Sequence, residues 1–321
     1  MDFRLTEDQR ALADGTRGLM ARLYPAGRLR EDAAGAAAGT PVTLDRGMWR
    51  ALGEAGFFAL RLPEERGGLG LGLPEAVLVF EEAGRALLPG PLVTTHLAAG
   101  WVPGAAEGGT VVTAVDGELT EWLEASDRVL GSYDKAEPVR SVDPLTPLHR
   151  VVGGEPAGGV VGGGVTAGGV TAGGVTTGGV TAGELLTCAQ QTGSAARTLE
   201  LAVRHATTRE QFGRPIGSFQ AVKHLCADML VRAEMARTAV HAAAVSGDPG
   251  EAAAARLLAD EAAVRNARDC LQVFGGMGFT WEAEVHLHIK RSWILRSRGR
   301  SVAECEERLA ESLLDETLCG I

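Results

Sequence analysis

Apolar residues in the first third of the chain recur near helical spacing, and each run has a recognisable start or stop. The segment Thr6–Gln9 has the capping-box pattern, in which the first side chain accepts from the fourth N–H and the fourth reaches back. The apolar positions that follow indicate one helix face: Leu12, Leu19, Met20 and Leu23. A second helix is predicted from about Leu44 to Gly56.

A glycine-rich stretch, LPEERGGLGLGLPE, separates this helix from a third one. Its glycines favour a loop, and Pro74 suits the first turn of the helix that continues through Phe80. That helix is predicted to end near Leu88, before the Pro-Gly-Pro at residues 89–91. Together these helices predict an N-terminal helical domain over residues 1–105.

The middle of the chain has a weaker pattern. Residues 108–119 predict a short strand or two around Val111 and Val115, and the stretch from there to Arg150 is rich in proline and acids with little periodicity. We therefore expect few core residues in this part of the chain.

A five-residue repeat then places valine at positions 160, 165, 170, 175 and 180, with glycine pairs between most of them. A period of five matches neither the helical period of about 3.6 nor the strand period of about 2, so a low-complexity linker is predicted. The alternative is a phosphate-cradling glycine loop, but Gly-Lys-Ser/Thr and a strong preceding strand are missing. Residues 106–183 are therefore predicted to be a reduced, degenerate β segment.

Long helical patterns return at Glu184, and Gly193 in the first of them is expected to allow close approach of a neighbouring element. Four helices are predicted, over residues 184–207, 219–246, 251–274 and 281–295, and a second capping box at Ser301–Glu304 opens a last one. Short connections imply antiparallel neighbours, so residues 184–321 predict a C-terminal four-helix-bundle domain. The fold class is mainly α.

Composition supports this fold class and excludes several functions. The 321 residues are 45% hydrophobic but only 5% aromatic, with much alanine and leucine, which favours helix over sheet. The net charge of -10 argues against a nucleic-acid partner, which needs a dense basic face. The N-terminus, MDFRLTEDQR, lacks an apolar signal core, and no run of about 18 apolar residues occurs. We therefore expect a cytoplasmic protein without a membrane segment.

Neither disulfides nor a metal site is predicted. The five cysteines are odd in number and far apart, so they are expected to be reduced thiols. His286 and His288 stand two residues apart and face different sides of a helix, which places them at the surface or an interface. Trp281 and Trp293 are expected in the core or an interface.

Five cations also stand close together near the end of the chain: Lys290, Arg291, Arg296, Arg298 and Arg300. We expect them to form a solvated helix end, where cations suit the helix dipole. Contacts with a phosphate group of a ligand or with an acidic face of a partner are the alternative.

Two segments carry candidate chemistry. The connector TREQFGRPIGSFQ offers Arg209, Gln211 and Phe212, a cation, an amide and a ring that suit one extended ligand. The segment LQVFGGMGF adds Gln272 and the bare backbone of Gly275 and Gly276, which can approach a phosphate closely. Alternatively, Arg209 pairs with a nearby carboxylate and the glycines only end a helix.

Together, TREQFGRPIGSFQAVKHLCADM and LQVFGGMGFTWE resemble the C-terminal helical domain of the acyl-CoA dehydrogenase family. The N-terminal segments FRLTEDQRAL and WRALGEAGFFALRLPEERGGLGLGLPEAVLVFEEAGRALLPGPL agree in order and spacing. The resemblance covers about the first hundred residues and everything after Glu184. It implies a helical N-domain, a middle β-domain, a four-helix C-domain, and FAD bound between subunits.

The resemblance also implies site residues. The family's contacts to the adenosine and diphosphate part of FAD fall on Arg209, Gln211 and Phe212, and Gln272, Gly275 and Gly276 point towards a neighbouring subunit's flavin. The implied substrate is an acyl-CoA thioester, and the implied electron acceptor is an electron-transferring flavoprotein.

The sequence departs from the family at the reaction centre. Neither the Thr-Glu-x-x-(Ala/Gly)-Gly-Ser-Asp segment nor the tryptophan strand that surround the flavin ring occurs between Gly108 and Gly183. The family's general base should stand near Gly299, where RSRGRS has no carboxylate. An upstream base position falls next to Glu184, which otherwise reads as an acid suited to a helix start. The catalytic base therefore stays unknown.

These departures leave three hypotheses. The motif GFTWE with His286-Leu287 resembles the smaller subunit of two-gene dehydrogenases, so the first is an FAD-dependent subunit of a hetero-oligomer whose fuller partner completes the active site. The second is a non-catalytic assembly or regulatory homologue that has lost flavin. The third is a self-sufficient homomeric dehydrogenase that uses Glu184 as base. The acyl chain of the substrate is not predicted.

Overall fold

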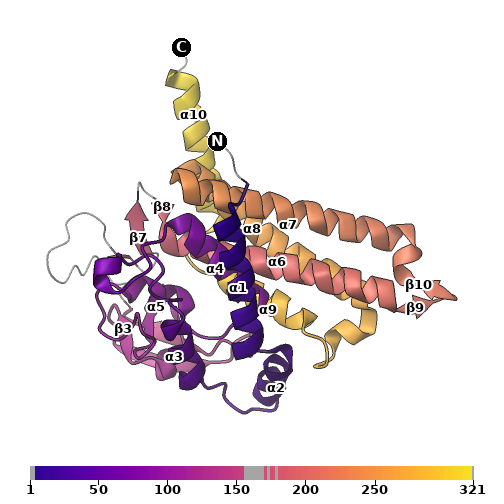
Figure 1. Cartoon of the computed structure of the whole chain (residues 1–321), viewed down its shortest axis with the longest axis horizontal. Coiled ribbons are helices and arrows are strands. Elements are labelled where there is room, and N and C mark those ends of the chain that lie inside the picture. Colours follow the sequence, from indigo (N-terminus) through magenta and orange to yellow (C-terminus); the bar gives the residue numbers. More distant parts are fainter. Residues whose placement is uncertain (1–3, 155–169, 172–173, 178–179, 320–321) are drawn as a thin grey trace.

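The computed structural model describes residues 4–154, 170–171, 174–177 and 180–319 (Figure 1). It is mainly α, as the sequence predicts, with a small β part between two groups of helices. No helix within these ranges combines the length and the apolar character that crossing a membrane requires.

The N-terminal helices surround an aromatic core. They are α1 (Glu7–Leu23), α2 (Ala26–Ala37), α3 (Arg46–Glu54), the short η1 (Glu64–Arg66), α4 (Leu73–Arg85) and α5 (Leu92–Ala98). The predicted capping box at Thr6 forms, and Pro74 lies in the first turn of α4. Trp49 packs on Phe58 with ring centroids 4.7 Å apart, and Phe57 packs on Phe80 at 5.0 Å. The periodicity did not predict α2 or α5.

The middle part contains more strands than its weak pattern predicted. β1 (Val112–Ala114) pairs in parallel with β3 (Arg128–Leu130). β2 (Leu119–Glu121), β5 (Leu148–Val152) and β4 (Lys135–Val139) form an antiparallel sheet in that order, and η2 (Leu123–Ala125) follows β2. These strands are too short for a period of two to stand out in the sequence.

The prediction of a linker in the valine repeat is wrong for the part that the structure describes. β6 (Val170–Thr171), β7 (Gly174–Thr177) and β8 (Val180–Thr181) pair antiparallel. Val170, Val175 and Val180 each lie in one of these strands, so the repeat supplies one valine to every strand of this small sheet. The repeat before residue 170 lies outside the described residues.

The C-terminal bundle is formed by α6 (Ala182–Thr208), α7 (Gln220–Ser246), α8 (Pro249–Phe274) and α9 (Val285–Arg296), and α10 (Val302–Cys319) packs on α8. Between α6 and α7 lie β9 (Glu210–Gln211), β10 (Arg214–Pro215) and η3 (Ile216–Ser218), and η4 (Gly275–Phe279) follows α8. In Figure 1 the β9–β10 hairpin forms the far tip of the long α6 and α7 pair.

Two glycines let the N-terminal helix α4 cross closely over α6. A Cβ atom at Gly193 would lie 1.9 Å from the carbonyl oxygen of Glu81, and one at Gly84 would lie 2.0 Å from that of Gln190. Contacts this short are not possible for a side chain, so both positions require glycine. The sequence predicted this role for Gly193, and the crossing joins the two helical parts.

The cations at the end of the chain do not form the predicted solvated helix end. Arg291 pairs with the buried Asp143, Arg298 with Glu121, and Arg300 with Glu184. In each case the acid comes from a distant segment. Because buried acids attract arginines from other elements, three of the five cations hold the middle part and α6 against the region after α9.

Both histidines of α9 are buried, which corrects their predicted surface position. His288 is fully buried and its Nδ1 lies 2.8 Å from the hydroxyl oxygen of Ser194. Burial lowers the pKa of His286 to about 4. Trp281 and Trp293 are 42% and 39% exposed, so the core is excluded for both.

Candidate functional site

The first group of predicted site residues lies on the β9–β10 hairpin. Gln211 pairs with Arg214 across the hairpin, and Phe212 occupies its turn with a left-handed φ of 55°. The Phe212 ring is 92% exposed and meets Phe219 only edge-on, with centroids 6.1 Å apart. A large ring held outward in a strained backbone conformation is typical of a contact with another molecule.

Arg209 stands at the base of this hairpin with an exposed side chain. Within the described ranges its guanidinium has neither an ion pair nor a side-chain hydrogen bond, so the alternative in which it pairs with a nearby carboxylate is not supported by this part of the chain. Its charge acts on His205, whose pKa is lowered by burial and then by the Arg209 cation. The five donors of Arg209 are therefore available to an anion.

The second group lies at the other side of the same bundle end. Gln272 is exposed near the end of α8, and Gly275 follows it with a left-handed φ of 61°. A Cβ atom at Gly275 or Gly276 would meet no atom within 4 Å. Packing therefore does not explain Gly276, and both glycines expose their backbone to open space.

A stacked pair joins the two groups. The His205 ring near the end of α6 lies 4.1 Å from the Phe274 ring at the end of α8, with 15° between the planes. This stack brings the hairpin and η4 to one end of the bundle, here called the hairpin end and defined by residues 209–215 and 272–279. Sequence reasoning missed this pair, because neither residue carries a signal beyond its place beside the motifs.

The two candidate positions for a catalytic base meet in a different place. Glu184 and Gly299 both line a cavity of about 700 Å³, here called the Glu184 cavity, together with Arg298, Arg300 and residues of α5, β1 and β2. Glu184 belongs to the first turn of α6, and Gly299 lies after α9 with a φ of 64°. Residues 115 positions apart thus face one space.

The Glu184 carboxylate is held by an arginine. It is 5% exposed, and the Nε of Arg300 donates to both of its oxygens at 3.0 Å while Nη2 donates to one at 2.5 Å. The hydrogen bond that Arg300 donates to Glu184 raises the pKa of Arg300, so this guanidinium keeps its charge. A carboxylate with both oxygens engaged by one cation is a poor acceptor for a substrate proton.

A buried arginine fixes the backbone around Gly299. Arg256 of α8 is 1% exposed, and its Nη2 donates to the carbonyl oxygens of Leu295, Arg296 and Arg298. Its Nε donates to Asp260 at 3.1 Å. This arginine holds the end of α9 in place, and no sequence pattern predicts this role, because its acceptors are carbonyl groups about 40 residues away.

The cavity wall on the middle part has a second ion pair. The Nη1 of Arg298 donates to Glu121 of β2 at 2.6 Å. Glu121 and Arg298 both line the Glu184 cavity, so its lining contains two arginine–glutamate ion pairs. In the described part of the chain, His, Cys, Asp and Glu side chains form no group of three or more that could hold a metal.

Comparison with known proteins identifies the family of this chain. Residues 6–110 match the acyl-CoA dehydrogenase N-terminal domain, and residues 173–298 match the acyl-CoA dehydrogenase C-terminal domain. The acyl-CoA dehydrogenase IpdE2 of Mycobacterium tuberculosis is 36% identical over 279 residues, covering 77% of this chain and 80% of IpdE2. This chain belongs to the acyl-CoA dehydrogenase family.

Other relatives agree in length and fold. IpdE2 of Mycolicibacterium smegmatis is 35% identical, covering 77% of this chain and 82% of that protein. The ChsE4–ChsE5 complex of Mycobacterium tuberculosis has a chain that superposes with a TM-score of 0.77, at 23% identity, over 98% of this chain and 99% of that one. The glutaryl-coenzyme A dehydrogenase complex with glutaryl-CoA gives 0.77 at 18% identity, over 98% and 97%.

Members of this acyl-CoA dehydrogenase family are FAD-dependent oxidoreductases of lipid metabolism. The hairpin end fits the dinucleotide part of such a cofactor on three counts. The Arg209 guanidinium has no acid partner in the described ranges, the Phe212 ring is exposed, and the glycines of η4 leave open space. The Glu184 cavity fits the reaction less well, because Arg300 engages Glu184 and Arg298 engages Glu121.

Proposed function

We propose that this chain is an FAD-dependent acyl-CoA dehydrogenase subunit that works in a hetero-oligomer with a fuller family member. The proposal rests on a contrast between the residue expected to bind the cofactor and the two positions expected to supply the general base. Arg209 has no acid partner among the described residues, whereas Glu184 lies against Arg300 and Gly299 has no side chain. The chain thus keeps groups for holding a dinucleotide and lacks an available base.

In this proposal the hairpin end holds the cofactor. Arg209 binds the diphosphate through charge-assisted hydrogen bonds, each contributing about 1.5 to 3 kcal/mol. Gln211 and Phe212 contact the adenosine side, and Gln272, Gly275 and Gly276 face the flavin of a neighbouring subunit. When bound, FAD supplies the acceptor for the hydride that leaves the β-carbon of an acyl-CoA thioester.

The α-proton of the thioester needs a base that this chain does not offer in an available form. A positioned base contributes roughly 100-fold to 10,000-fold in rate, and Glu184 would first have to leave Arg300. The fuller partner supplies that base and the ring contacts in our proposal. This argument also disfavours the homomeric enzyme that uses Glu184.

The α7 surface supports a partner subunit. Leu230, Val231 and Met235 are 49%, 56% and 53% exposed, although α7 also buries apolar residues on its other side. A helix that is apolar on more than one side is usually covered all round, so this exposed strip suits a subunit interface. The related ChsE4–ChsE5 structure is itself a complex of two proteins. An electron-transferring flavoprotein is the proposed electron acceptor.

We also propose the domain limits that the sequence predicts, namely residues 1–105, 106–183 and 184–321. The strand β1 begins at Val112 and α6 at Ala182, which supports limits near these positions.

Co-purification tests the proposal. The chain is expressed alone and with a full-length family member encoded beside its gene, and the visible absorbance of flavin is measured in both preparations. Flavin that is retained only in the complex is expected. Arg209→Ala should lower flavin occupancy of the complex by about tenfold or more, through the loss of charge-assisted bonds. Arg22→Ala, an exposed arginine on α1, is the matched control and should leave occupancy unchanged.

The alternative is a non-catalytic assembly or regulatory homologue that has lost flavin. The two ion pairs in the lining of the Glu184 cavity favour it, because they hold the carboxylates of Glu184 and Glu121 against arginines. A colourless complex, in which the partner is fully active without this chain, would establish this alternative. An isolated chain whose flavin is bleached by acyl-CoA, with loss of bleaching in Glu184→Gln, would instead establish the homomeric enzyme.

A further inference from the structure

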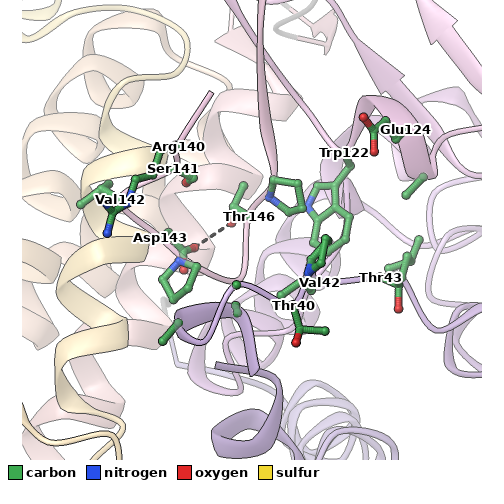
Figure 2. Close-up of a pocket in the computed structure, with 18 of the residues that line it drawn as sticks. Thr40, Val42, Thr43, Trp122, Glu124, Arg140, Ser141, Val142, Asp143 and Thr146 are labelled. Carbon is green, nitrogen blue, oxygen red and sulfur yellow. Dashed lines mark hydrogen bonds between the residues drawn. The ribbon is translucent and has the colours of Figure 1, made fainter. Parts of the chain in front are cut away.

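A second large cavity lies away from both regions described above. Its volume is about 800 Å³, and Figure 2 shows it between the α2–α3 connection, with Thr40, Val42 and Thr43, and the β4–β5 connection, with Arg140, Ser141 and Val142. Trp281 and Lys290, before and within α9, complete its lining. We call it the Arg140 cavity. None of its lining residues belongs to the predicted flavin set or to the Glu184 cavity.

Most charged groups of the Arg140 cavity already have partners. Arg46 forms an ion pair with Asp127 and Asp143 forms one with Arg291, and the carboxylate of Glu124 lies 3.2 Å from Nε2 of His149. The carboxylate of Asp143 also accepts from the hydroxyl of Thr146, as the dashed line in Figure 2 marks. Both acids that line the cavity are therefore engaged by cationic or hydrogen-bonding groups.

Two cations remain without an acid. Arg140 is exposed and has no ion pair or side-chain hydrogen bond among the residues that the structure describes. Lys290 has no carboxylate within ion-pair distance in the same ranges, and its Nζ donates to Nδ1 of His286 at 3.3 Å and lies 4.7 Å from the Trp281 ring centroid. Burial lowers the pKa of Lys290, and the carboxylate of Asp143 opposes this shift only in part.

An unsatisfied hydroxyl lies in the same cavity lining, next to Arg140 in the chain. The Oγ atom of Ser141 is buried and has no hydrogen-bond partner within the described part of the chain. Buried hydroxyl groups normally find a partner, so an isolated one in a cavity lining points to a missing acceptor. Arg140 and Ser141 are neighbours on the β4–β5 connection and both line the cavity.

The remaining lining is apolar. Val142 is 45% exposed and Trp281 is 42% exposed, and both line the cavity with Val42. Cavities of this size that combine apolar walls with a few polar groups are typical of sites for small organic molecules.

We propose that the Arg140 cavity binds a small organic anion, whose carboxylate or phosphate group accepts from Arg140, Ser141 and Lys290 and whose apolar body lies against Val42, Val142 and Trp281. The positive charge of the two cations selects the anion, and the walls select a body with aromatic or aliphatic carbon.

Titration of the purified full chain tests this site. Benzoate and phenyl phosphate serve as probes, benzamide is the neutral analogue, and binding is followed by calorimetry. Saturable binding of at least one anion is expected, with benzamide binding at least about tenfold more weakly. The anion that binds more tightly identifies the head group, carboxylate or phosphate.

Substitutions localise the binding. Lys290→Met and Arg140→Met each remove one cation while keeping a long side chain, and each should weaken anion binding by about tenfold or more. Arg22→Met, on the exposed side of α1, should leave it unchanged. Circular dichroism shows whether each variant is folded. Arg140 is exposed on a connection, so Arg140→Met should fold and still test the proposal even if Lys290→Met does not. Absence of anion binding, equal binding of benzamide, or binding that Arg140→Met leaves intact would overturn the proposal.

Discussion

The hairpin end and the Glu184 cavity differ in how their polar groups are satisfied. At the hairpin end Arg209 has no acid partner among the described residues, and Gly275 and Gly276 face open space. In the Glu184 cavity both family positions for a base are closed, since Glu184 lies against Arg300 and Gly299 has no side chain. One chain can therefore keep side chains that are available to a ligand in one region while the acids of another region form ion pairs that stabilise the fold.

Because of this difference, the two regions should contribute differently to the stability of the fold. Ion pairs inside the cavity join segments that are 116 and 177 residues apart in sequence, so they contribute to the fold. Most side chains of the hairpin end are exposed, although Val273 is buried, so the exposed ones contribute little to the fold. Substitutions should therefore cost stability in the cavity and ligand binding at the hairpin end.

The largest loss of stability is expected where α4 crosses α6, the contact that joins the N-terminal helices to the C-terminal bundle. Gly193→Ala places a Cβ atom 1.9 Å from the backbone oxygen of Glu81, which cannot rotate away. Separation of α4 from α6 should lower the free energy of unfolding by at least about 3 kcal/mol, measured by urea denaturation.

The matched control for this crossing is Gly15→Ala in α1. A Cβ atom there has no atom within 4 Å, so alanine should raise the free energy of unfolding by up to about 1 kcal/mol. A Gly193→Ala protein that is as stable as the wild type would contradict the close crossing.

Removal of the arginine that closes the Glu184 cavity should have the next largest effect. Arg300→Ala leaves the buried carboxylate of Glu184 without its guanidinium and should lower the free energy of unfolding by about 3 kcal/mol. Glu184→Gln in the same protein should restore part of the loss.

The control for Arg300→Ala is an ion pair on the surface. Arg265 pairs with Glu261 on α8, with side chains 62% and 48% exposed, so Arg265→Ala should change the free energy of unfolding by less than about 1 kcal/mol. Equal losses in the two variants would argue that the cavity pair is no more structural than a surface pair.

The interior and the hairpin end should also differ in their response to acid. Burial, followed by the cation of Arg61, lowers the pKa of His96 to about 4, against about 6.5 in an unfolded chain. Between these values the unfolded chain binds a proton that the fold excludes, so the free energy of unfolding falls as the pH falls. The contribution of His96 between about pH 7.5 and pH 4.5 should be roughly 2 to 3 kcal/mol.

Urea denaturation at both pH values measures this difference. His96→Gln should reduce the fall in the free energy of unfolding by that amount. His205→Gln at the hairpin end should reduce it much less, because His205 is only partly buried. If the free energy of unfolding falls as much in His96→Gln as in the wild type, the neutral His96 is not the source of the pH dependence.

The smallest effect is expected at the turn of the hairpin. Phe212→Gly relieves a left-handed φ of 55° and removes a ring that is 92% exposed, so the free energy of unfolding should rise by up to about 1 kcal/mol. Flavin occupancy of the complex should fall in the same variant. A stability gain with unchanged occupancy would place the ring outside the cofactor site.

Several elements could be predicted from sequence because their causes are local. The capping boxes at Thr6 and Ser301 form as expected, and so does the role of Gly193. The short strands of the middle part and the hairpins of the valine repeat could not be predicted, because their pairing depends on partners that a period of two or 3.6 does not detect.

The candidate sites also differ in whether the sequence predicts them. The motifs around Arg209 and Gly275 identified the family from short segments alone. The Arg140 cavity and the partner of Glu184 left no trace in the sequence pattern, since their residues come from separate connections and helices.

The sequence by itself determined the mainly α fold, the helix starts and the family, because each rests on residues within a few positions of one another. Only the tertiary structure decided which charges are neutralised. Arg291 meets Asp143 from 148 positions away, and Arg300 meets Glu184 from 116. The physical reason is that a buried charge takes the opposite charge that packing brings nearest, and packing is a property of the whole chain.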